Sequence, residues 1–366
     1  MMAEPHARAV ALSHKARLLA LALLLSGGCA HFVPLPEQAE LHRAKTTDGW
    51  EIALVRYRPA GIPSGLPVIL VPGISANARN MDLDEGHSLA RWLAAHGREA
   101  WTVSLRSAGD SDVADEKKNR KPGFNFDVYW EQDLPAVIAK VKSVSGAESV
   151  DYVGHSMGGM VAYAYLSQGG RGLNAVATLG SPMRLDLGTG SEGVLVSGTK
   201  LFPNTWMIPS SVGAYLAAPF QGMIDNGPFQ VFFYSPFNTT LQSWRRLLVY
   251  GTADISAAVA SQLMSVVGTG AFTCNEGDHD FRKALGKVTT PVLVVAGRLD
   301  RVALTPAVYD AYRALGGPKE WLLISRANGA VAEYGHMDLV IGERAPTEVW
   351  TPVLEFLNRQ EPKELP

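Results

Sequence analysis

Hydrophobic residues recur along the chain in short continuous runs, and longer segments of mixed apolar and polar residues separate them. The runs that we interpret as buried strands are 68–71, 100–103, 150–153, 175–179, 291–296 and 320–324. Helix-length segments lie at 86–96, 126–143, 158–167 and 347–358. Apolar strands that alternate with helices are typical of a parallel sheet covered by helices on both faces. Asp48-Gly49 predicts a hairpin turn before the first of these runs.

The alternation stops at residues 183–285, which are rich in Gly, Pro, Phe, Trp and Met. We interpret this stretch as a lid or cap inserted into the sheet domain, because it directly follows a strand and ligands bind beyond the carboxyl ends of such strands. The alternative is a small second domain without a functional role. Its aromatic residues either form the core of the insertion or contact substrate; they are Phe202, Trp206, Tyr215, Phe220, Phe229, Phe232 and Phe233.

Residues 1–28 have the pattern of an export signal. A basic segment precedes the apolar run Leu18–Leu25, and small residues follow it. The run is shorter than the about 20 apolar residues that a membrane-spanning helix needs. The sequence LSGGC resembles a bacterial lipobox, so Cys29 is a candidate for lipidation and for membrane anchoring in a bacterial envelope. Secretion or periplasmic release without a lipid, and an unmodified cysteine, are the alternatives.

With the leader and the insertion set aside, residues 29–182 and 286–366 form the predicted sheet domain. The 366-residue chain carries 33 basic and 35 acidic side chains, a net charge of −2, which excludes a protein built to neutralise nucleic-acid phosphates. Two cysteines exclude a disulfide scaffold and a multi-cysteine zinc module. The function must therefore come from a local site.

The strongest local motif is Gly154-His155-Ser156-Met157-Gly158-Gly159, between a predicted strand and a predicted helix. This context is typical of a nucleophile elbow, in which a sharp turn projects a serine hydroxyl above the sheet. Gly154 and Gly158 suit the close passage of strand and helix. The alternative is an ordinary strand-to-helix turn with an unreactive serine.

A serine needs a base and an acid that orients the base. Asp300 follows the apolar run 291–296, which places it at the active end of the sheet, and His336 lies on a loop before the last helix. The order Ser156, Asp300, His336 is the one expected downstream of such an elbow. Asp300 is otherwise a loop cap or an ion-pair partner, and Asp338 is either a supporting residue or a local cap.

The oxyanion of an ester-cleavage intermediate needs two backbone N–H donors. The Met157 amide is one candidate, and the Ile74 amide, after Gly73 at the end of the first central strand, is the second. An ordinary turn at the end of that strand is the alternative. Asp278, His279 and Asp280 lie near Cys274 but match no zinc spacing, so we expect no metal and no cofactor.

These motifs together resemble the α/β-hydrolases, and three stretches resemble their acid-lipase (gastric and lysosomal-type) branch. The stretches are TTDGWEIALVRY, FDVYWEQDLPAVIAKVKSVSGAESVDYVGHSMGG and GHMDLVIGERAPTEVW. The resemblance implies an α/β-hydrolase fold and a triad of Ser156, Asp300 and His336. It does not extend to the insertion. Those lipases have His-Gly where this chain has Pro72-Gly73, a change that keeps the backbone donor but alters the loop.

The sequence therefore predicts a serine ester hydrolase, of lipase or esterase type, that acts on apolar carboxylic esters through an acyl-enzyme. An acyltransferase on the same fold is one alternative. The other is a non-catalytic surface lipoprotein that binds an apolar ligand. The serine at the elbow argues against the hydrolases of this fold that use an aspartate nucleophile.

Overall fold

The computed structural model describes residues 34–37, 39–118, 120–184, 203, 206–223 and 228–362. The predicted leader 1–28 and Cys29 lie outside the described residues, as do parts of the predicted insertion. In the described residues, no helix is long and apolar enough to cross a membrane.

Eight strands form one sheet in the order β1-β2-β4-β3-β5-β6-β9-β10. They are β1 (Glu40–Lys45), β2 (Glu51–Tyr57), β3 (Val68–Val71), β4 (Ala100–Ser104), β5 (Val150–His155), β6 (Leu173–Leu179), β9 (Val292–Gly297) and β10 (Lys319–Ile324). From β4 to β10 all neighbours pair in parallel, whereas β1 pairs with β2 and β2 with β4 in the antiparallel sense. The predicted mostly parallel sheet is confirmed, with the hairpin at its edge.

Helices cover both faces of this sheet and bury an apolar core on each. One core includes α3 (Leu134–Ser145), α4 (Met157–Ser167), α10 (Phe281–Ala284) and α11 (Thr305–Ala314). The other includes α2 (Leu89–Ala95), α12 (Asp338–Ile341) and α13 (Thr351–Arg359). The π-helical turns η4 (Tyr129–Asp133) and η9 (Pro346–Trp350) lead directly into α3 and α13. The central strands β3, β4 and β5 are buried along their whole length, which explains their continuous apolar runs.

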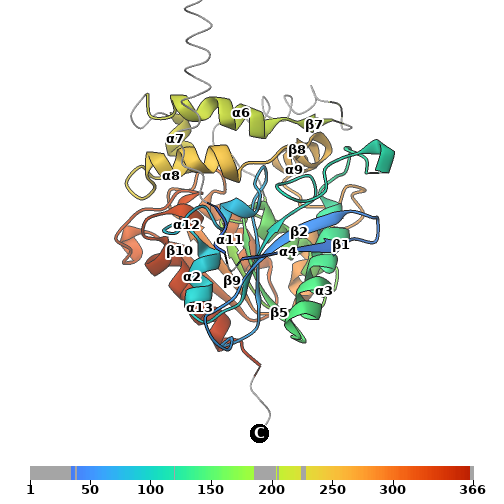
Figure 1. Cartoon of the computed structure of the whole chain (residues 1–366), viewed down its shortest axis with the longest axis horizontal. Coiled ribbons are helices and arrows are strands. Elements are labelled where there is room, and N and C mark those ends of the chain that lie inside the picture. The colour runs from blue at the N-terminus through green and yellow to red at the C-terminus, as the bar shows by residue number, and fades with distance from the viewer. Residues whose placement is uncertain are drawn as a thin grey trace, which may run out of the picture.

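The predicted insertion forms a layer of helices over one end of the sheet (Figure 1). Its described elements in this layer are β7 (Met207–Ile208), α6 (Ser210–Ala217), η5 (Ala218–Phe220), α7 (Pro228–Phe233), α8 (Leu241–Arg246), η6 (Leu247–Gly251), β8 (Ile255–Ser256) and α9 (Ala257–Thr269). The helix α10 also lies within residues 183–285, but it packs against α4 of the sheet domain. Trp244, Leu247 and Leu248 join the core that contains α2 and α13. Part of the insertion is therefore buried in the same core as the sheet domain.

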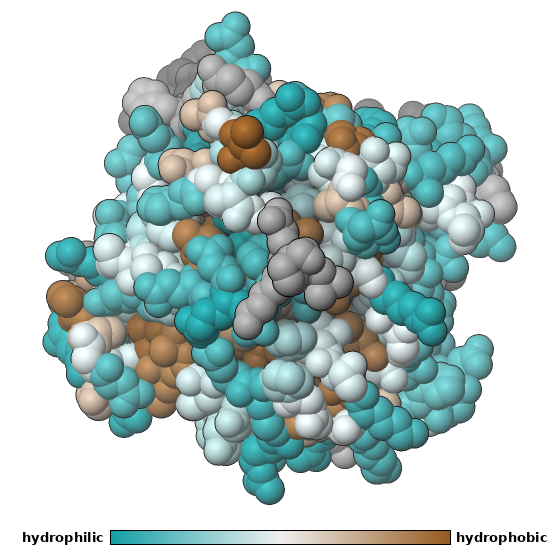
Figure 2. All heavy atoms as spheres, turned by 90° about the horizontal axis from the view of Figure 1, so that it is seen from below, coloured by the Kyte–Doolittle hydropathy of each residue, from teal (hydrophilic) through white to brown (hydrophobic). Residues whose placement is uncertain are grey.

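Figure 2 shows the face of the molecule that lies opposite the insertion. Hydrophilic residues cover most of that face, and hydrophobic residues appear in separate groups.

The remaining described elements are the short turns η2 (Ala78–Asn80), η3 (Glu116–Lys118), η7 (Leu285–Lys287) and η8 (Arg326–Asn328).

Candidate active site

Ser156 lies at the junction of β5 and α4, where the chain turns sharply. Its backbone has φ 53° and ψ −122°, a left-handed conformation that is strained for a residue with a side chain. The Ser156 amide donates to the carbonyl of Leu179 at 2.8 Å, which anchors the turn to β6. The turn thus holds the hydroxyl beyond the carboxyl end of the sheet.

Close backbone packing surrounds this turn and explains its glycines. A Cβ atom on Gly158 would lie 2.3 Å from the carbonyl oxygen of Val71, at the end of β3. A Cβ atom on Gly154 would lie 2.5 Å from the amide nitrogen of Gly159. Both contacts are with backbone, which has no room to move. Strand and helix therefore approach as closely as the sequence motif requires.

The loop after β3 lies directly against Ser156. A Cβ atom on Gly73 would lie 3.0 Å from Ser156 Cβ and 3.5 Å from its Oγ. Ser75 follows with φ 57°, and its hydroxyl donates to the carbonyl of Ala253 in the insertion at 2.8 Å. Ile74 and Met157, whose amides are the predicted oxyanion donors, line one small hollow beside this loop.

The structure brings the predicted acid and base into contact. The Nδ1 atom of His336 lies 2.7 Å from Oδ2 of Asp300. Because a carboxylate only accepts hydrogen bonds, Nδ1 is the protonated nitrogen and Nε2 carries the lone pair. Oδ1 of Asp300 accepts from the amides of Val302, at 2.9 Å, and Ala303, at 2.7 Å, just past β9. The carboxylate is therefore fixed at both oxygens.

Gly180, just after β6, is a supporting residue that the sequence did not single out. It has φ 57°, and a Cβ atom there would lie 3.1 Å from Oδ2 of Asp300 and 3.3 Å from Nδ1 of His336. A side chain at this position would push into the acid–base pair. An isolated Gly at the end of a predicted strand is the signal that could have found it.

His155, the residue before the nucleophile, is a second supporting residue that was missed. Its ring centre lies 4.6 Å from that of His336, and its Nε2 lies 3.1 Å from the carbonyl oxygen of His336. Burial lowers the pKa of His155 well below its ordinary value, so the ring is neutral. Because a carbonyl accepts, Nε2 is the donor, and His155 holds the backbone of His336.

One cavity of about 360 Å³ contains the side chains of Ser156 and His336 in its wall. The insertion contributes much of the remaining lining, namely Ser210, Gly213, Ala214, Ala217, Phe233, Trp244, Leu247, Leu248, Gly251 and Thr252. Phe233 stacks on Trp244 with ring centres 5.5 Å apart. Of the predicted aromatic set, Phe233 thus faces the cavity, whereas Trp206 and Phe220 are exposed and Phe202 lies outside the described residues.

Asp338, two residues after His336, is completely buried. Its carboxylate accepts from the amides of Gly335 and Ser235, both at 2.6 Å, and from the hydroxyl of Thr239 at 2.5 Å. Burial raises the pKa of Asp338 to about 6, although these three donors act in the opposite direction. Both Ser235 and Thr239 belong to the insertion, so this residue is more than a local cap.

The cluster near Cys274 has ordinary structural contacts. The Cys274 thiol donates to Asp278 at 2.8 Å, and the side chain of Asp280 caps the start of α10. Across the part of the chain that the structure describes, no group of three His, Cys, Asp or Glu residues could hold a metal ion.

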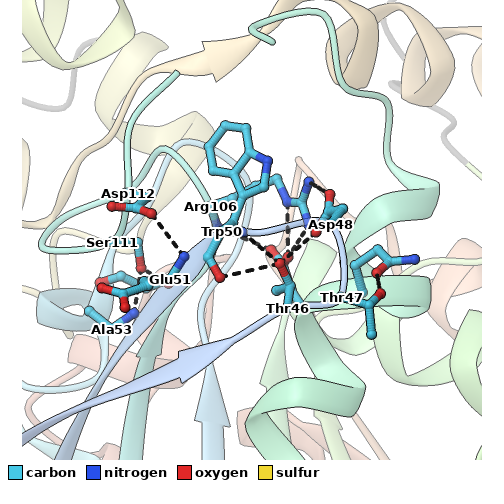
Figure 3. A network of polar contacts seen from close by, with 12 residues as sticks. Thr46, Thr47, Asp48, Trp50, Glu51, Ala53, Arg106, Ser111 and Asp112 are labelled. Carbon is cyan, nitrogen blue, oxygen red and sulfur yellow. Dashed lines mark hydrogen bonds and ion pairs between the residues drawn. The ribbon is translucent and has the colours of Figure 1, made fainter. Parts of the chain in front are cut away.

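The loop after β4 is fixed by a buried arginine (Figure 3). Arg106 bonds to Asp133 at 2.6 Å and to Asp48 of the β1–β2 hairpin at 2.7 Å, and its guanidinium lies 4.8 Å from the ring centre of Trp50. Ser107, the next residue, has φ 62°. Together with Ser75 and Ser156, it makes three strained serines at the carboxyl ends of β3, β4 and β5.

Comparison with known proteins identifies the family. The profile of the alpha/beta hydrolase family matches residues 68–349, so the chain belongs to this family. It is 24% identical to lipase lipl-1 of Caenorhabditis elegans over 87% of this chain and 88% of that protein. Lipase member K of Mus musculus is also 24% identical, with 87% of each chain covered. The predicted resemblance to lipases is confirmed, and these relatives support a carboxylic-ester hydrolase as the class of enzyme.

Solved structures share the fold. A thermophilic esterase from Thermogutta terrifontis has a TM-score of 0.58 and 17% identity, and the match covers 88% of this chain and all 100% of that one. A membrane phospholipase A, described as a bacterial virulence factor, has a TM-score of 0.52 and 20% identity over 94% and 92% of the two chains.

Proposed function

We propose that the chain is a serine ester hydrolase with Ser156 as nucleophile, His336 as base and Asp300 as the acid that orients the base. One observation carries the proposal. Ser156, on its strained turn, and His336, whose Nδ1 lies 2.7 Å from Asp300, line one cavity, and the lone pair of His336 is left on Nε2. A purely structural pair of Asp300 and His336 would not require a strained serine in the wall of the same cavity.

In the proposed reaction, Ser156 Oγ forms a bond to the ester carbonyl carbon and gives its proton to His336 Nε2. The amides of Met157 and Ile74 stabilise the resulting oxyanion, and one such donor is typically worth about 3–4 kcal/mol. His336 then protonates the leaving alcohol as its C–O bond breaks. In the second half, His336 deprotonates water, the hydroxide attacks the acyl carbon, and the proton returns to Ser156 as the carboxylic acid leaves.

The lining of the cavity supports an apolar acyl group as the substrate moiety. Ala214, Phe233, Trp244 and Leu247 present apolar surface beside the nucleophile. Residues 206–223 of the insertion contain no charged residue, and they expose apolar side chains at Trp206, Val212, Leu216, Phe220 and Met223. The lipase names of the relatives agree with a lipidic ester.

A fluorophosphonate probe and a series of p-nitrophenyl esters test this function. We expect the wild type to be labelled and to hydrolyse the esters, and Ser156→Ala to do neither. Ser325→Ala is the matched control, because Ser325 is also a buried serine just past a sheet strand, and its hydroxyl has no hydrogen-bond partner among the described residues. An unlabelled wild type, or an active Ser156→Ala enzyme, contradicts the proposal.

The same assay separates hydrolysis from acyl transfer. With an added alcohol, a hydrolase yields mainly free acid, whereas a transferase yields mainly the new ester. We propose hydrolysis, and a dominant ester product would replace it with transfer.

For the N-terminus, we propose export through residues 1–28 and anchoring through a lipid on Cys29. The wild type should incorporate a radiolabelled fatty acid and sediment with membranes. Cys29→Ala should do neither, and an unlabelled wild type would leave plain secretion as the explanation.

A further inference from the structure

The base-bearing loop contains a buried carboxylate with no cationic partner. Asp338 is fully buried at the start of α12, and it forms no ion pair within the described residues. The groups around it are also acidic or neutral: Asp300, Tyr234 and Tyr334. Burying a charged group in this way is unfavourable unless hydrogen bonds compensate. Its three donors must therefore matter to the local structure.

Those donors come from two segments that are far apart in the sequence. Gly335, directly before His336, belongs to the base-bearing loop, whereas Ser235 and Thr239 lie about a hundred positions earlier in the insertion. Asp338 therefore joins the backbone beside the base to the segment 233–239.

Further hydrogen bonds join the base-bearing loop to the segment 233–239. The amide of Met337, directly after His336, donates to the carbonyl of Phe233 at 2.8 Å. The amide of Glu343 donates to the carbonyl of Asn238 at 2.6 Å, and the amide of Arg344 donates to its side-chain oxygen at 3.1 Å. The segment 233–239 thus lies alongside the loop from one side of His336 to the end of α12.

Glycines make this close approach feasible. A Cβ atom on Gly335 would lie 2.9 Å from Cα of Tyr234, and one on Gly342 would lie 2.8 Å from Nδ2 of Asn238. The two segments therefore touch at backbone distance. The amides on both sides of His336 are held from the insertion, directly by Phe233 or through Asp338.

We propose that Asp338 is a positioning residue that makes the placement of His336 depend on the segment 233–239 of the insertion. The proposal rests on the function proposed above, because it assigns His336 as the base. Asp338 touches no substrate; it fixes the backbone from which the imidazole reaches Ser156. Loss of this anchor misplaces the base and slows proton transfer, while the apolar cavity still binds the ester.

Two substitutions separate geometry from charge. Asp338→Ala removes the carboxylate that accepts all three hydrogen bonds, and we expect kcat to fall by about 100-fold, the effect of a small misplacement of a catalytic group. KM should stay within about threefold, because the proposal leaves ester binding intact. Asp338→Asn keeps one oxygen for the two amides and turns an NH₂ group to Thr239, so it should restore kcat to within about fivefold of wild type.

Thr239→Val tests the insertion side of the junction without touching the base-bearing loop. It removes one donor at nearly constant volume, and we expect kcat to fall by about three- to tenfold. This variant also keeps the proposal falsifiable if Asp338→Ala does not fold.

The matched control is Asp310→Ala, which removes another buried aspartate, on α11, with ion pairs to Arg184 and Arg282. It should lower the unfolding temperature but leave kcat per labelled site near that of wild type. Wild-type rates in Asp338→Ala, or an Asp338→Asn enzyme as slow as Asp338→Ala, overturn the positioning role. Failure of the wild type to react with the fluorophosphonate overturns the proposed function instead, so the two failures are distinguishable.

Discussion

Ser156 and His336 line the same cavity, but the contacts that hold them differ in kind. Around Ser156, backbone packs on backbone, and Gly158 and Gly154 leave no space for one additional carbon atom. Around His336, the backbone is held by hydrogen bonds, several of them from the insertion. The turn at Ser156 is therefore held mainly by close backbone packing, whereas the loop of His336 depends in addition on hydrogen bonds from the insertion. This difference predicts different responses to substitution, which decrease in size in the following order.

The largest effect is expected at the acid. In Asp300→Asn, the amide oxygen should keep the hydrogen bonds from Val302 and Ala303, so the NH₂ group faces Nδ1 of His336. Nδ1 must then accept, and Nε2 carries the proton and no longer serves as a base. We expect kcat to fall by about 10³–10⁴-fold with an unchanged unfolding temperature. A loss of less than tenfold would show that Asp300 does not orient the base.

A pair of helical glycines tests the close backbone packing at the Ser156 turn. Gly158→Ala places a methyl group against the carbonyl of Val71, and we expect a loss of about 3 kcal/mol or more in the free energy of unfolding. Gly213→Ala in α6 is the control, since no atom lies within 4 Å of its Cβ position, and it should gain about 0.5–1 kcal/mol. Urea unfolding measures both. Equal effects would show that the close backbone contact at Gly158 does not constrain the turn at Ser156.

The insertion side of the cavity should determine acyl-chain preference. Trp244→Phe shortens a buried side chain that lines the cavity and packs on Phe233 and Tyr234. We expect the ratio of kcat/KM for long over short p-nitrophenyl esters to rise by roughly tenfold. This is the discrimination that one or two methylene groups typically provide in an apolar pocket. An unchanged ratio would place the acyl group elsewhere in the cavity.

The smallest effect concerns a second junction between the insertion and the sheet domain. His87 lies 2.8 Å from Asp84 and 3.0 Å from Glu343, and Arg246 of α8 also pairs with Asp84. Burial alone would lower the pKa of His87, but the hydrogen bond and charge of Asp84, aided by Glu343, raise it above 6.5.

A raised histidine pKa gives stability that is complete below pH 6.5 and is lost as the pH rises through the folded-state value. The advantage of wild type over His87→Gln should therefore be about 1 kcal/mol at pH 6 and should decline toward pH 9. Thermal unfolding across this range measures it. A difference that grows with pH would contradict the charged state of His87.

Much of the sheet domain was predictable because short stretches of sequence determine its strands and turns. Buried parallel strands are apolar along their length, and the hairpin turn carries Asp48-Gly49 with Gly49 at φ 90°. The serine motif is also local, since a turn between β5 and α4 needs its glycines within a few residues. Hence the fold and family predictions were confirmed, and the structure brings Asp300 and His336 together.

The missed features depend on contacts between distant segments. The contact between Asp338 and Ser235 joins positions about a hundred residues apart, and no periodicity in either segment indicates it. The sequence motif contains His155 but does not indicate its role, because that role depends on a hydrogen bond to the carbonyl of the distant His336. Within the insertion, α6 has no buried residue, so its sequence offers no core-facing positions from which to predict it.

The junction at residues 233–239 has a consequence for exchanging modules between members of this family. A graft that replaces the whole insertion would also replace the residues that hold the base-bearing loop, and it would then confound specificity with catalytic competence. A cut between α6 and Phe233 keeps the segment 233–239 with the base-bearing loop, although α6 is also hydrogen-bonded to Ala253 and Asp254. Chimeras cut there would exchange the part of the cavity lining that α6 contributes while keeping the native support of His336.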